Sequence, residues 1–480
     1  MAIDTIKDLD AAINGVVDPI SATDVRVLDE KALRERVADQ LAHCAAIGAD
    51  KDARERARWL VRAAGRALGI RLASIQGLYT ALGRGEAGPF TCPAMNIRGM
   101  AYDSCRAVFR TAKKCDAGAF LFEIARSEIS YTDQRPAEYA AVVLAAAIRE
   151  GWRGPVFIQG DHFQVNAKKY AENAAAEDAN VRNLIEEGIA AGFYNIDVDT
   201  STVVDLSKPT TKEQQRLNYE LASEYTALIR KLEPRGVTVS VGAEIGEVGG
   251  KNSTVEEFLA FMDGFVESLE KKGKGLAGIS KISIQTGTSH GGVPLPDGTI
   301  AKVAIDFAAL VDIGKVAQSR YGLCGAVQHG ASTLPDEVFD RFPKSHTSEI
   351  HLATGFQNLL FDHPALPRDF KDTMYAWLRE NCKDEIKAGQ TDEQFFYKTR
   401  KKALGPFKKQ FYTLPASVRD ALSAALEAKL DLLFGKLGVA GSRAAVERWV
   451  KPADVPLALA SSAAAGSRGP SGKDEADSGE

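Results

Sequence analysis

Eight short apolar runs, separated by helix-like or loop segments, constrain the fold of this chain more than any other feature. The runs end in small or polar residues and cover 90–96, 117–123, 155–161, 193–199, 237–244, 278–287, 323–330 and 348–354. Alternation of this kind predicts parallel strands joined by crossover helices, and eight such strands predict an α/β fold closed into a (β/α)8 TIM barrel. An open, doubly wound sheet is the alternative, because periodicity alone does not separate the two folds.

The apolar runs occupy the middle of the chain, and the sequence on either side of them has a different character. Apolar residues recur three and four positions apart in these flanks, over 31–47, 52–68, 369–381, 393–404 and 416–434, as in amphipathic helices. The last residues are mainly Ala, Ser and Gly with a few charges and cannot bury a core. We therefore predict an N-terminal helical extension at 1–87, a barrel at 88–365, a C-terminal helical region at 366–455 and a disordered tail at 456–480.

Composition narrows the class of ligand. The formal net charge is −4, so there is no basic field for nucleic acid or for an acidic membrane surface, and a small-molecule substrate is expected. The six cysteines form no Cys-x-x-Cys pair, which indicates reduced thiols. With no apolar stretch of membrane-spanning length and no signal-peptide pattern at Met1, the expected location is the cytoplasm.

Histidines and carboxylates follow several of the predicted strands. Asp161 and His162 close the third run, Glu244 closes the fifth, and His290 and His329 lie at the ends of the sixth and seventh. One such histidine by itself would be read as a hydrogen-bonded loop residue. Three of the chain's seven histidines at equivalent strand ends instead favour a metal site, because three imidazoles leave an open position for substrate on a catalytic Zn²⁺.

Small residues adjoin two of these histidines. Gly291, Gly330 and Ser332 expose backbone amides with little side-chain obstruction, and Thr354 adds a hydroxyl after the eighth run. Oriented amides of this kind bind phosphate, although glycines also serve simply to make tight turns. Their position beside the proposed metal ligands favours a phosphate site.

Taken in order, these motifs resemble the class II, metal-dependent fructose- and tagatose-bisphosphate aldolases. The matching segments are Asp-His at 161–162, Ala-Glu-Ile-Gly at 243–246, Gly-Thr-Ser-His-Gly at 287–291 and His-Gly-Ala-Ser at 329–332. Supporting segments lie at 93–96, 196–201 and 334–336. The resemblance covers about 88–365 and leaves both flanking regions unexplained.

The resemblance implies a role for each matching residue. His162, His290 and His329 match the three zinc ligands, and Asp199 and Glu244 match carboxylates near the metal that are at times alternative ligands. Another divalent metal could replace Zn²⁺.

Other matching residues would handle the substrate. Asp161 matches the acid that exchanges a proton with the C4 oxygen as the C3–C4 bond breaks or forms, and Asn96 matches a residue at the same mouth. The phosphate of dihydroxyacetone phosphate would be held, often with a monovalent cation nearby, by Gly291, Gly330, Ser332 and Thr354.

Two departures from the family pattern concern the proton-abstracting base and the eighth strand. Where the family has an acidic loop this chain has Lys-Asn-Ser-Thr at 251–254, so Glu247 becomes the candidate base. Glu257 is expected in the first turn of a helix capped by Thr254. His351 replaces an asparagine that touches substrate in the family, so it either binds substrate oxygens or is a satisfied strand-end histidine.

The resemblance implies a zinc-dependent aldolase that cleaves a ketose (bis)phosphate, such as fructose 1,6-bisphosphate, to dihydroxyacetone phosphate and an aldehyde. Two alternatives remain: a non-catalytic aldolase-like subunit, and a metal-dependent enediolate enzyme such as a sugar-phosphate isomerase. A homo-oligomer is expected, since oligomers are common in the family. The expected partner is the phosphosugar, with neither nucleic acid nor membrane.

Overall fold

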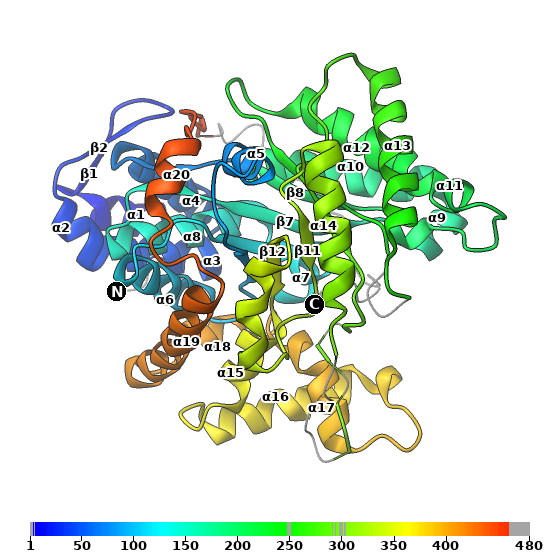
Figure 1. Ribbon diagram of the computed structural model, residues 1–480. Coiled ribbons are helices and arrows are strands. Elements are labelled where there is room, and N and C mark those ends of the chain that lie inside the picture. The colour runs from blue at the N-terminus through cyan, green and yellow to red at the C-terminus, as the bar shows by residue number, and fades with distance from the viewer. Residues whose placement is uncertain are drawn as a thin grey trace.

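The computed structural model describes residues 3, 5–246, 251–289, 291–292, 294–296, 301 and 304–459. Within these ranges the chain forms a central barrel with helical regions on both sides of it in the sequence (Figure 1).

Eight parallel strands close into the barrel. Their order around it is β10-β11-β12-β4-β5-β7-β8-β9, so each strand pairs with the next barrel strand along the chain and the last pairs with the first. The strands are β4 (Cys92–Asn96), β5 (Leu121–Ala125), β7 (Ile158–Gln164), β8 (Asn195–Asp199), β9 (Ser240–Glu244), β10 (Lys281–Ile284), β11 (Ala326–Gln328) and β12 (Thr347–Leu352). Each predicted apolar run contains most or all of one strand. The predicted (β/α)8 barrel is therefore confirmed, and closure excludes the open sheet.

Helices cover the outside of the barrel. They are α6 (Ala101–Lys114), α7 (Arg126–Thr132), α8 (Pro136–Glu150), α9 (Ala167–Glu172), α10 (Ala174–Ala191), α11 (Thr211–Gln214), α12 (Arg216–Leu232), α13 (Val255–Lys272), α14 (Phe307–Tyr321) and α15 (Thr354–Asp362). The start of α13 follows from its sequence as predicted: Thr254 Oγ1 accepts from the Glu257 amide, and the Glu257 carboxylate accepts from the Thr254 amide.

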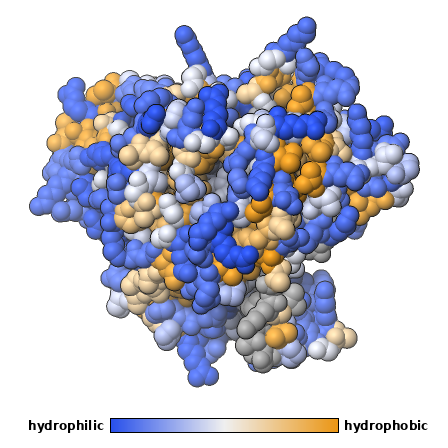
Figure 2. Space-filling model, in the orientation of Figure 1, coloured by the Kyte–Doolittle hydropathy of each residue, from blue (hydrophilic) through white to orange (hydrophobic). Residues whose placement is uncertain are grey.

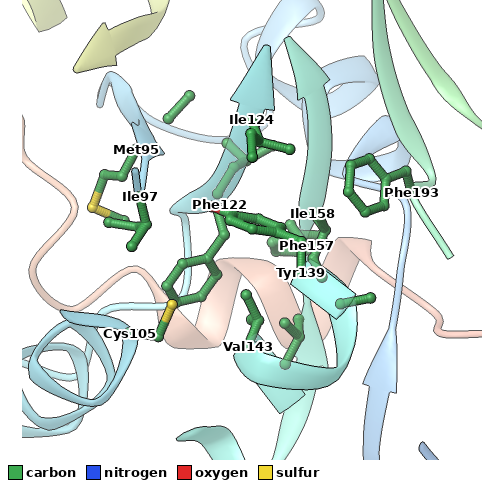
Figure 3. Packing of buried hydrophobic residues seen from close by; sticks show 14 of the residues in the cluster. Met95, Ile97, Cys105, Phe122, Ile124, Tyr139, Val143, Phe157, Ile158 and Phe193 are labelled. Carbon is green, nitrogen blue, oxygen red and sulfur yellow. The ribbon is translucent and has the colours of Figure 1, made fainter. Parts of the chain in front are cut away.

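The core between strands and helices is apolar. Figure 3 shows Phe122 of β5 and Ile158 of β7 grouped with Tyr139 and Val143 of α8. All four side chains are fully buried. Burial of this kind contributes about 25 cal/mol per Å² of apolar surface, which fixes the outer helices against the strands.

The region before the barrel contributes a hairpin, a short extra strand pair and several helices. The elements are α1 (Ile6–Ile13), β1 (Val17–Pro19), β2 (Val25–Val27), α2 (Glu30–Ala32), α3 (Ala38–Ile47), α4 (Lys51–Ala67), β3 (Ile70–Leu72), which pairs with β6 (Gly154–Val156), and α5 (Gln76–Gly83). The helices α3 and α4 both contact α8, so this region lies against the outer face of the barrel.

The region after the barrel is helical as well. Its helices are α16 (Arg368–Asn381), α17 (Asp392–Thr399), α18 (Lys408–Tyr412), α19 (Ala416–Lys436) and α20 (Arg443–Trp449), and α19 contacts α6. Part of the predicted tail is fixed to the first extension: Trp59 Nε1 donates to the Leu457 carbonyl at 3.1 Å, and the Leu459 amide donates to the Ala22 carbonyl at 2.8 Å. Leu457 and Leu459 of the predicted tail thus each have a hydrogen-bond partner in the first extension. Residues 460–480 lie outside the described residues.

The face seen in Figure 2 is mostly hydrophilic, with apolar side chains in scattered patches. Among the helices of the described ranges, none combines the length and the apolar character needed to cross a membrane.

Candidate metal and active site

The candidate site lies at the carboxyl ends of the barrel strands, where this fold builds active sites. An irregularity in β7 places two of its residues there. The pairing of β7 with β8 shifts register between Gly160 and Phe163, and His162 has φ 39°, in the left-handed region. Adjacent residues of a regular strand point to opposite faces, whereas a bulge re-aims one of them. Asp161 and His162 can therefore both take part in one site.

Two imidazoles meet at the centre of this site. His162 Nε2 lies 2.8 Å from His329 Nδ1, and both side chains are buried. The other nitrogen of His329, Nε2, lies 3.1 Å from Ser283 Oγ. Two ring nitrogens facing each other at this distance suit either one shared proton or one shared cation.

Carboxylates hold the other side of His162. Its Nδ1 lies 2.9 Å from Asp199 Oδ2 and 2.9 Å from Glu244 Oε1. A carboxylate on the far ring nitrogen orients a metal-binding histidine and leaves Nε2 for the ion. Asp199 itself is held by Ser201, whose hydroxyl donates to Asp199 Oδ1 at 2.7 Å.

The charges at the site suit a cation. Burial raises the pKa of Glu244 to about 7, and the neighbouring Asp199 adds to this effect. Burial would lower the pKa of His162, but Glu244 and Asp161 outweigh it and raise the pKa well above its usual range. Several buried carboxylates therefore lie close together around His162 and repel one another. A divalent ion bound to His162 and His329 would offset this repulsion.

Asp161 is held beside this pair. Its Oδ2 accepts a hydrogen bond from Asn96 Nδ2 at 3.0 Å, and its Oδ1 lies 3.9 Å from His162 Nε2. Asn96 also donates to Glu128 Oε2 at 2.7 Å, which fixes the amide. Burial acts to raise the pKa of Asp161, but the imidazoles of His162 and His351 hold it well below its usual range. The lowered pKa keeps Asp161 ionised at neutral pH, which is the form that can act as a proton acceptor.

The predicted phosphate-binding residues come from three loops that meet. Gly291 has φ 69°, and a Cβ on it would lie 3.5 Å from Thr354 Oγ1. Gly330 has φ 67° and lies against Thr288 of the preceding loop. Ser332 Oγ accepts from the Ala353 amide, directly before α15. These loops and the N-terminus of α15 thus lie close together, and such segments can supply the backbone amides that bind an anion.

The structure adds Arg98 to the candidate site. Its guanidinium is buried, donates from Nε to Glu128 Oε1 at 2.6 Å and from Nη1 to Thr354 Oγ1 at 3.3 Å. Nη1 also contacts Gln357 Oε1 at 3.2 Å. A fixed cation beside the predicted phosphate loops would attract the phosphate. The signal in the sequence was a charged residue two positions after the first apolar run.

His351 lies within the barrel, against His329. It is fully buried in β12, and its ring stacks on that of His329 with centroids 4.0 Å apart. Its Nε2 lies 2.8 Å from Glu349 Oε1.

The structure therefore brings together Asn96, Asp161, His162, Asp199, Glu244, His329 and His351 in one buried group, with the phosphate loops beside it. Two further predicted residues, Glu247 and His290, lie outside the described residues.

The family model described as fructose-bisphosphate aldolase class-II matches residues 78–411. No curated protein matches the chain. Solved structures share the fold at low identity.

Among the solved structures is a probable tagatose 6-phosphate kinase from Sinorhizobium meliloti 1021 (TM-score 0.56, 15% identity, covering 72% of this chain and 100% of that one). Another is the fructuronate-tagaturonate epimerase UxaE from Cohnella laeviribosi (TM-score 0.51, 12% identity, 89% and 90% covered). A third is a fructose-bisphosphate aldolase from Campylobacter jejuni (TM-score 0.45, 18% identity, 77% and 97% covered). The family match spans most of the chain and includes the whole barrel, and the chain therefore belongs to the class II fructose-bisphosphate aldolase family.

Proposed function

We propose that this protein is a zinc-dependent aldolase that reversibly cleaves a ketose (bis)phosphate, such as fructose 1,6-bisphosphate, to dihydroxyacetone phosphate and an aldehyde. The observation that carries the proposal is the buried carboxylate of Asp161 held beside the facing imidazoles of His162 and His329. The metal would be held by His162, His329 and His290, with Asp199 and Glu244 orienting His162 or serving as alternative ligands. Bound there, it would act as a Lewis acid on the ketone oxygen.

Several side chains and loops of the site would take part in this reaction. Asp161 would take the proton from the C4 hydroxyl as the C3–C4 bond breaks and return it in the reverse direction. Asn96 keeps that carboxylate in place through its hydrogen bond to Oδ2. Gly291, Gly330, Ser332 and Thr354 would hold the phosphate with Arg98, which fixes the reacting carbons relative to Asp161.

The second half-reaction needs a base for the C3 proton of dihydroxyacetone phosphate. We propose Glu247 for this step, since it follows β9 and the usual acidic loop is replaced by 251–254. We further propose that the protein is a cytoplasmic homo-oligomer and that a monovalent cation binds near the phosphate.

A metal-dependent epimerase or isomerase is the second candidate. His351, in place of the family's asparagine, is the observation that favours it, because an imidazole alters the polar groups beneath the substrate site. Both reactions share the enediolate, so the products distinguish them: isomerised ketose without triose would assign the second candidate.

The test is loss of the C3 proton signal of dihydroxyacetone phosphate in D₂O, followed by NMR. We expect exchange in the zinc-loaded protein, loss of exchange with a chelator, and recovery when zinc is restored. Asp161→Ala should slow C–C cleavage by about 100-fold or more while affecting proton exchange far less. Asp103→Asn, a buried carboxylate on α6 outside the site, is the matched control. Absence of exchange in a folded, zinc-loaded sample would contradict the proposal and favour a non-catalytic subunit.

A further inference from the structure

The segment 391–405, which comprises α17 and the turn after it, comes from the C-terminal helical region but lies at the carboxyl end of the barrel. Figure 1 shows α15 and α17 at the same end of the molecule. The segment contacts the chain that follows β4, β5, β10 and β12, and these contacts are Leu404 with Gly99, Gly405 with Tyr131, Gln394 with Pro294 and Arg400 with Asp362. Active sites of this fold are built from the segments that follow the strands. The segment is therefore placed to affect the candidate site.

One hydroxyl of this segment, from Tyr397 on α17, links two of the predicted phosphate-binding parts of the chain. It donates to the Gly291 carbonyl at 2.8 Å and accepts from Asn358 Nδ2 at 3.0 Å. Gly291 belongs to the loop after β10, and Asn358 lies on α15, about one turn after Thr354. The loop and the helix that are predicted to hold the phosphate are thus joined through Tyr397.

The hydrogen bond from Tyr397 fixes the direction of one peptide unit in the loop. The carbonyl of this unit, from Gly291, accepts from the hydroxyl, and its amide, from Gly292, donates to the Ser289 carbonyl at 3.1 Å. Because a peptide unit is planar, partners at both ends determine its orientation. Gly291 has φ 69°, a conformation that glycine adopts without strain, so the fixed unit also sets the direction of the Gly291 amide.

Arg400, a buried residue of the same segment, holds both Tyr397 and Asn358 in place. Its Nη2 donates to Asn358 Oδ1 at 2.6 Å, and its guanidinium binds both carboxylate oxygens of Asp362 at 2.6 and 3.0 Å. The guanidinium also lies 5.0 Å from the centroid of the Tyr397 ring. Since the Asn358 oxygen accepts from Arg400, its amide nitrogen donates to Tyr397, and the hydroxyl donates onward to Gly291. Hydrogen bonds in such a chain polarise and strengthen one another.

The charges around Tyr397 keep its hydroxyl a donor. Burial raises the pKa of Tyr397 above its usual range, although Asn358 and the cations Arg400 and Arg98 oppose this effect. The hydroxyl therefore stays protonated at neutral pH. The influence of Arg98 also means that Tyr397 lies near the buried cation beside the predicted phosphate loops.

We propose that Tyr397 is a positioning residue for the substrate phosphate. Its hydroxyl fixes Gly291 relative to the first turn of α15, so that the backbone groups of both segments can reach one phosphate. Tyr397 acts through Gly291 and not on the reacting carbons. The inference rests on the proposed function in taking Gly291 and Thr354 as phosphate-binding residues, and it gives the C-terminal helical region a part in substrate binding.

The test is the affinity of the full-length, zinc-loaded protein for inorganic phosphate, measured by isothermal titration calorimetry. Tyr397→Phe removes the hydroxyl and keeps the ring against Arg400. We expect the Kd for phosphate to rise about 10-fold, the effect of one lost hydrogen bond. Tyr321→Phe, which removes a hydroxyl bonded to Asp263 at 2.6 Å, is the matched control and should leave the Kd unchanged. A lower melting temperature of Tyr397→Phe with an unchanged Kd would show a purely structural role and overturn the proposal.

A double-mutant cycle tests the link through Asn358. Asn358→Ala removes the group that donates to Tyr397, so we expect it to weaken phosphate binding as well. Combined with Tyr397→Phe, it should add little to the loss caused by Tyr397→Phe alone, because the two side chains act along one chain of hydrogen bonds. Fully additive losses would overturn the link between the loop and α15.

Phosphate binding needs no turnover, so this test is separate from the proton-exchange experiment. Weaker phosphate binding by Tyr397→Phe, together with no exchange in the wild type, would support the role of Tyr397 and contradict the proposed aldolase reaction. Exchange in the wild type with an unchanged Kd in the variant would overturn the role of Tyr397 alone. A folded wild type that binds no phosphate would overturn it as well.

Discussion

Single buried charges decide what this barrel can do. Arg98 is the clearest case, because one guanidinium links Glu128, beside Asn96 and Asp161, to Thr354 at the phosphate loops. Burial makes such a link effective: in a low-dielectric interior each charge needs a partner, and a planar fork can serve two partners at once. The position of the proton-transferring group is thereby coupled to the position of the phosphate.

Replacing Arg98 by lysine should separate binding from chemistry. Arg98→Lys keeps the charge but loses the fork, so we expect KM for a phosphorylated substrate to rise about 10-fold or more, with a smaller fall in kcat. Steady-state kinetics with phosphorylated and unphosphorylated donor substrates measure this. Arg62→Lys, a buried arginine of α4 bonded to backbone carbonyls, is the control. An equal loss with both substrates would show that Arg98 supports the fold and not the phosphate.

Among the secondary-structure elements, the barrel helix α8 forms ion pairs with both extensions through one carboxylate. Glu138 on α8 pairs with Arg58 of α4 at 3.3 Å and with Lys408 of α18 at 3.0 Å. Helices from the start, the middle and the end of the chain therefore share one buried carboxylate. The amphipathic pattern of these helices indicates a buried face but does not reveal which element it packs against.

The Glu138 carboxyl should make the stability of the folded chain depend on pH. Burial raises the pKa of Glu138 to about 7, against the opposing effects of Lys408 and Arg58. The native chain thus keeps this proton up to about pH 7, whereas the unfolded chain loses it near its ordinary value of 4.5. Because the native state binds more protons in this window, the contribution of Glu138 to stability falls as pH rises from 4.5 to 7, by up to about 3 kcal/mol.

The difference in unfolding free energy between wild type and Glu138→Gln measures this effect, because glutamine does not titrate. We expect the variant to become more stable relative to the wild type as pH rises from 4.5 to 8. Urea denaturation at a series of pH values measures this change. Glu187→Gln, which removes a partly exposed carboxyl of α10 paired with Arg135, controls for a general loss of negative charge. A pH-independent difference for Glu138→Gln would contradict the assignment.

For the whole molecule, the barrel interior combines an apolar outer core with a strongly acidic centre. The fully buried apolar side chains lie between strands and helices, as Figure 3 shows around Phe122, while Asp161, Asp199 and Glu244 gather at the carboxyl end of the barrel. Carboxylates held this close repel one another without a cation. Metal binding should therefore be part of the stability of the fold.

Removing metal should lower the melting temperature of the whole chain. An ion present at a thousandfold excess over its Kd stabilises the native state by about 4 kcal/mol. For a chain of 480 residues that corresponds to about 4 °C. Thermal unfolding with EDTA, with calcium-saturated EDTA as control, and after restoring zinc measures the shift. No shift in a sample shown to have lost its metal would contradict this expectation.

The pattern of apolar and polar residues was enough to predict the eight strands, their order, the helical flanks and most residues at the strand ends. It could do so because the spacing of apolar residues is local, and because short crossovers place successive parallel strands side by side with their carboxyl ends at one edge. His162, Glu244 and His329 followed from that rule alone.

Which groups meet inside the barrel could not be predicted and depends on how the closed barrel folds. The bulge in β7 that lets Asp161 and His162 share a site depends on pairing with β8. The alignment of Glu123 and His351 depends on strands more than two hundred residues apart in sequence. Charged residues within apolar runs, such as Lys281, signal such contacts without naming the partner. A buried charge is stabilised by whichever opposite charge the closed barrel brings to it, and closure is a property of all eight strands together.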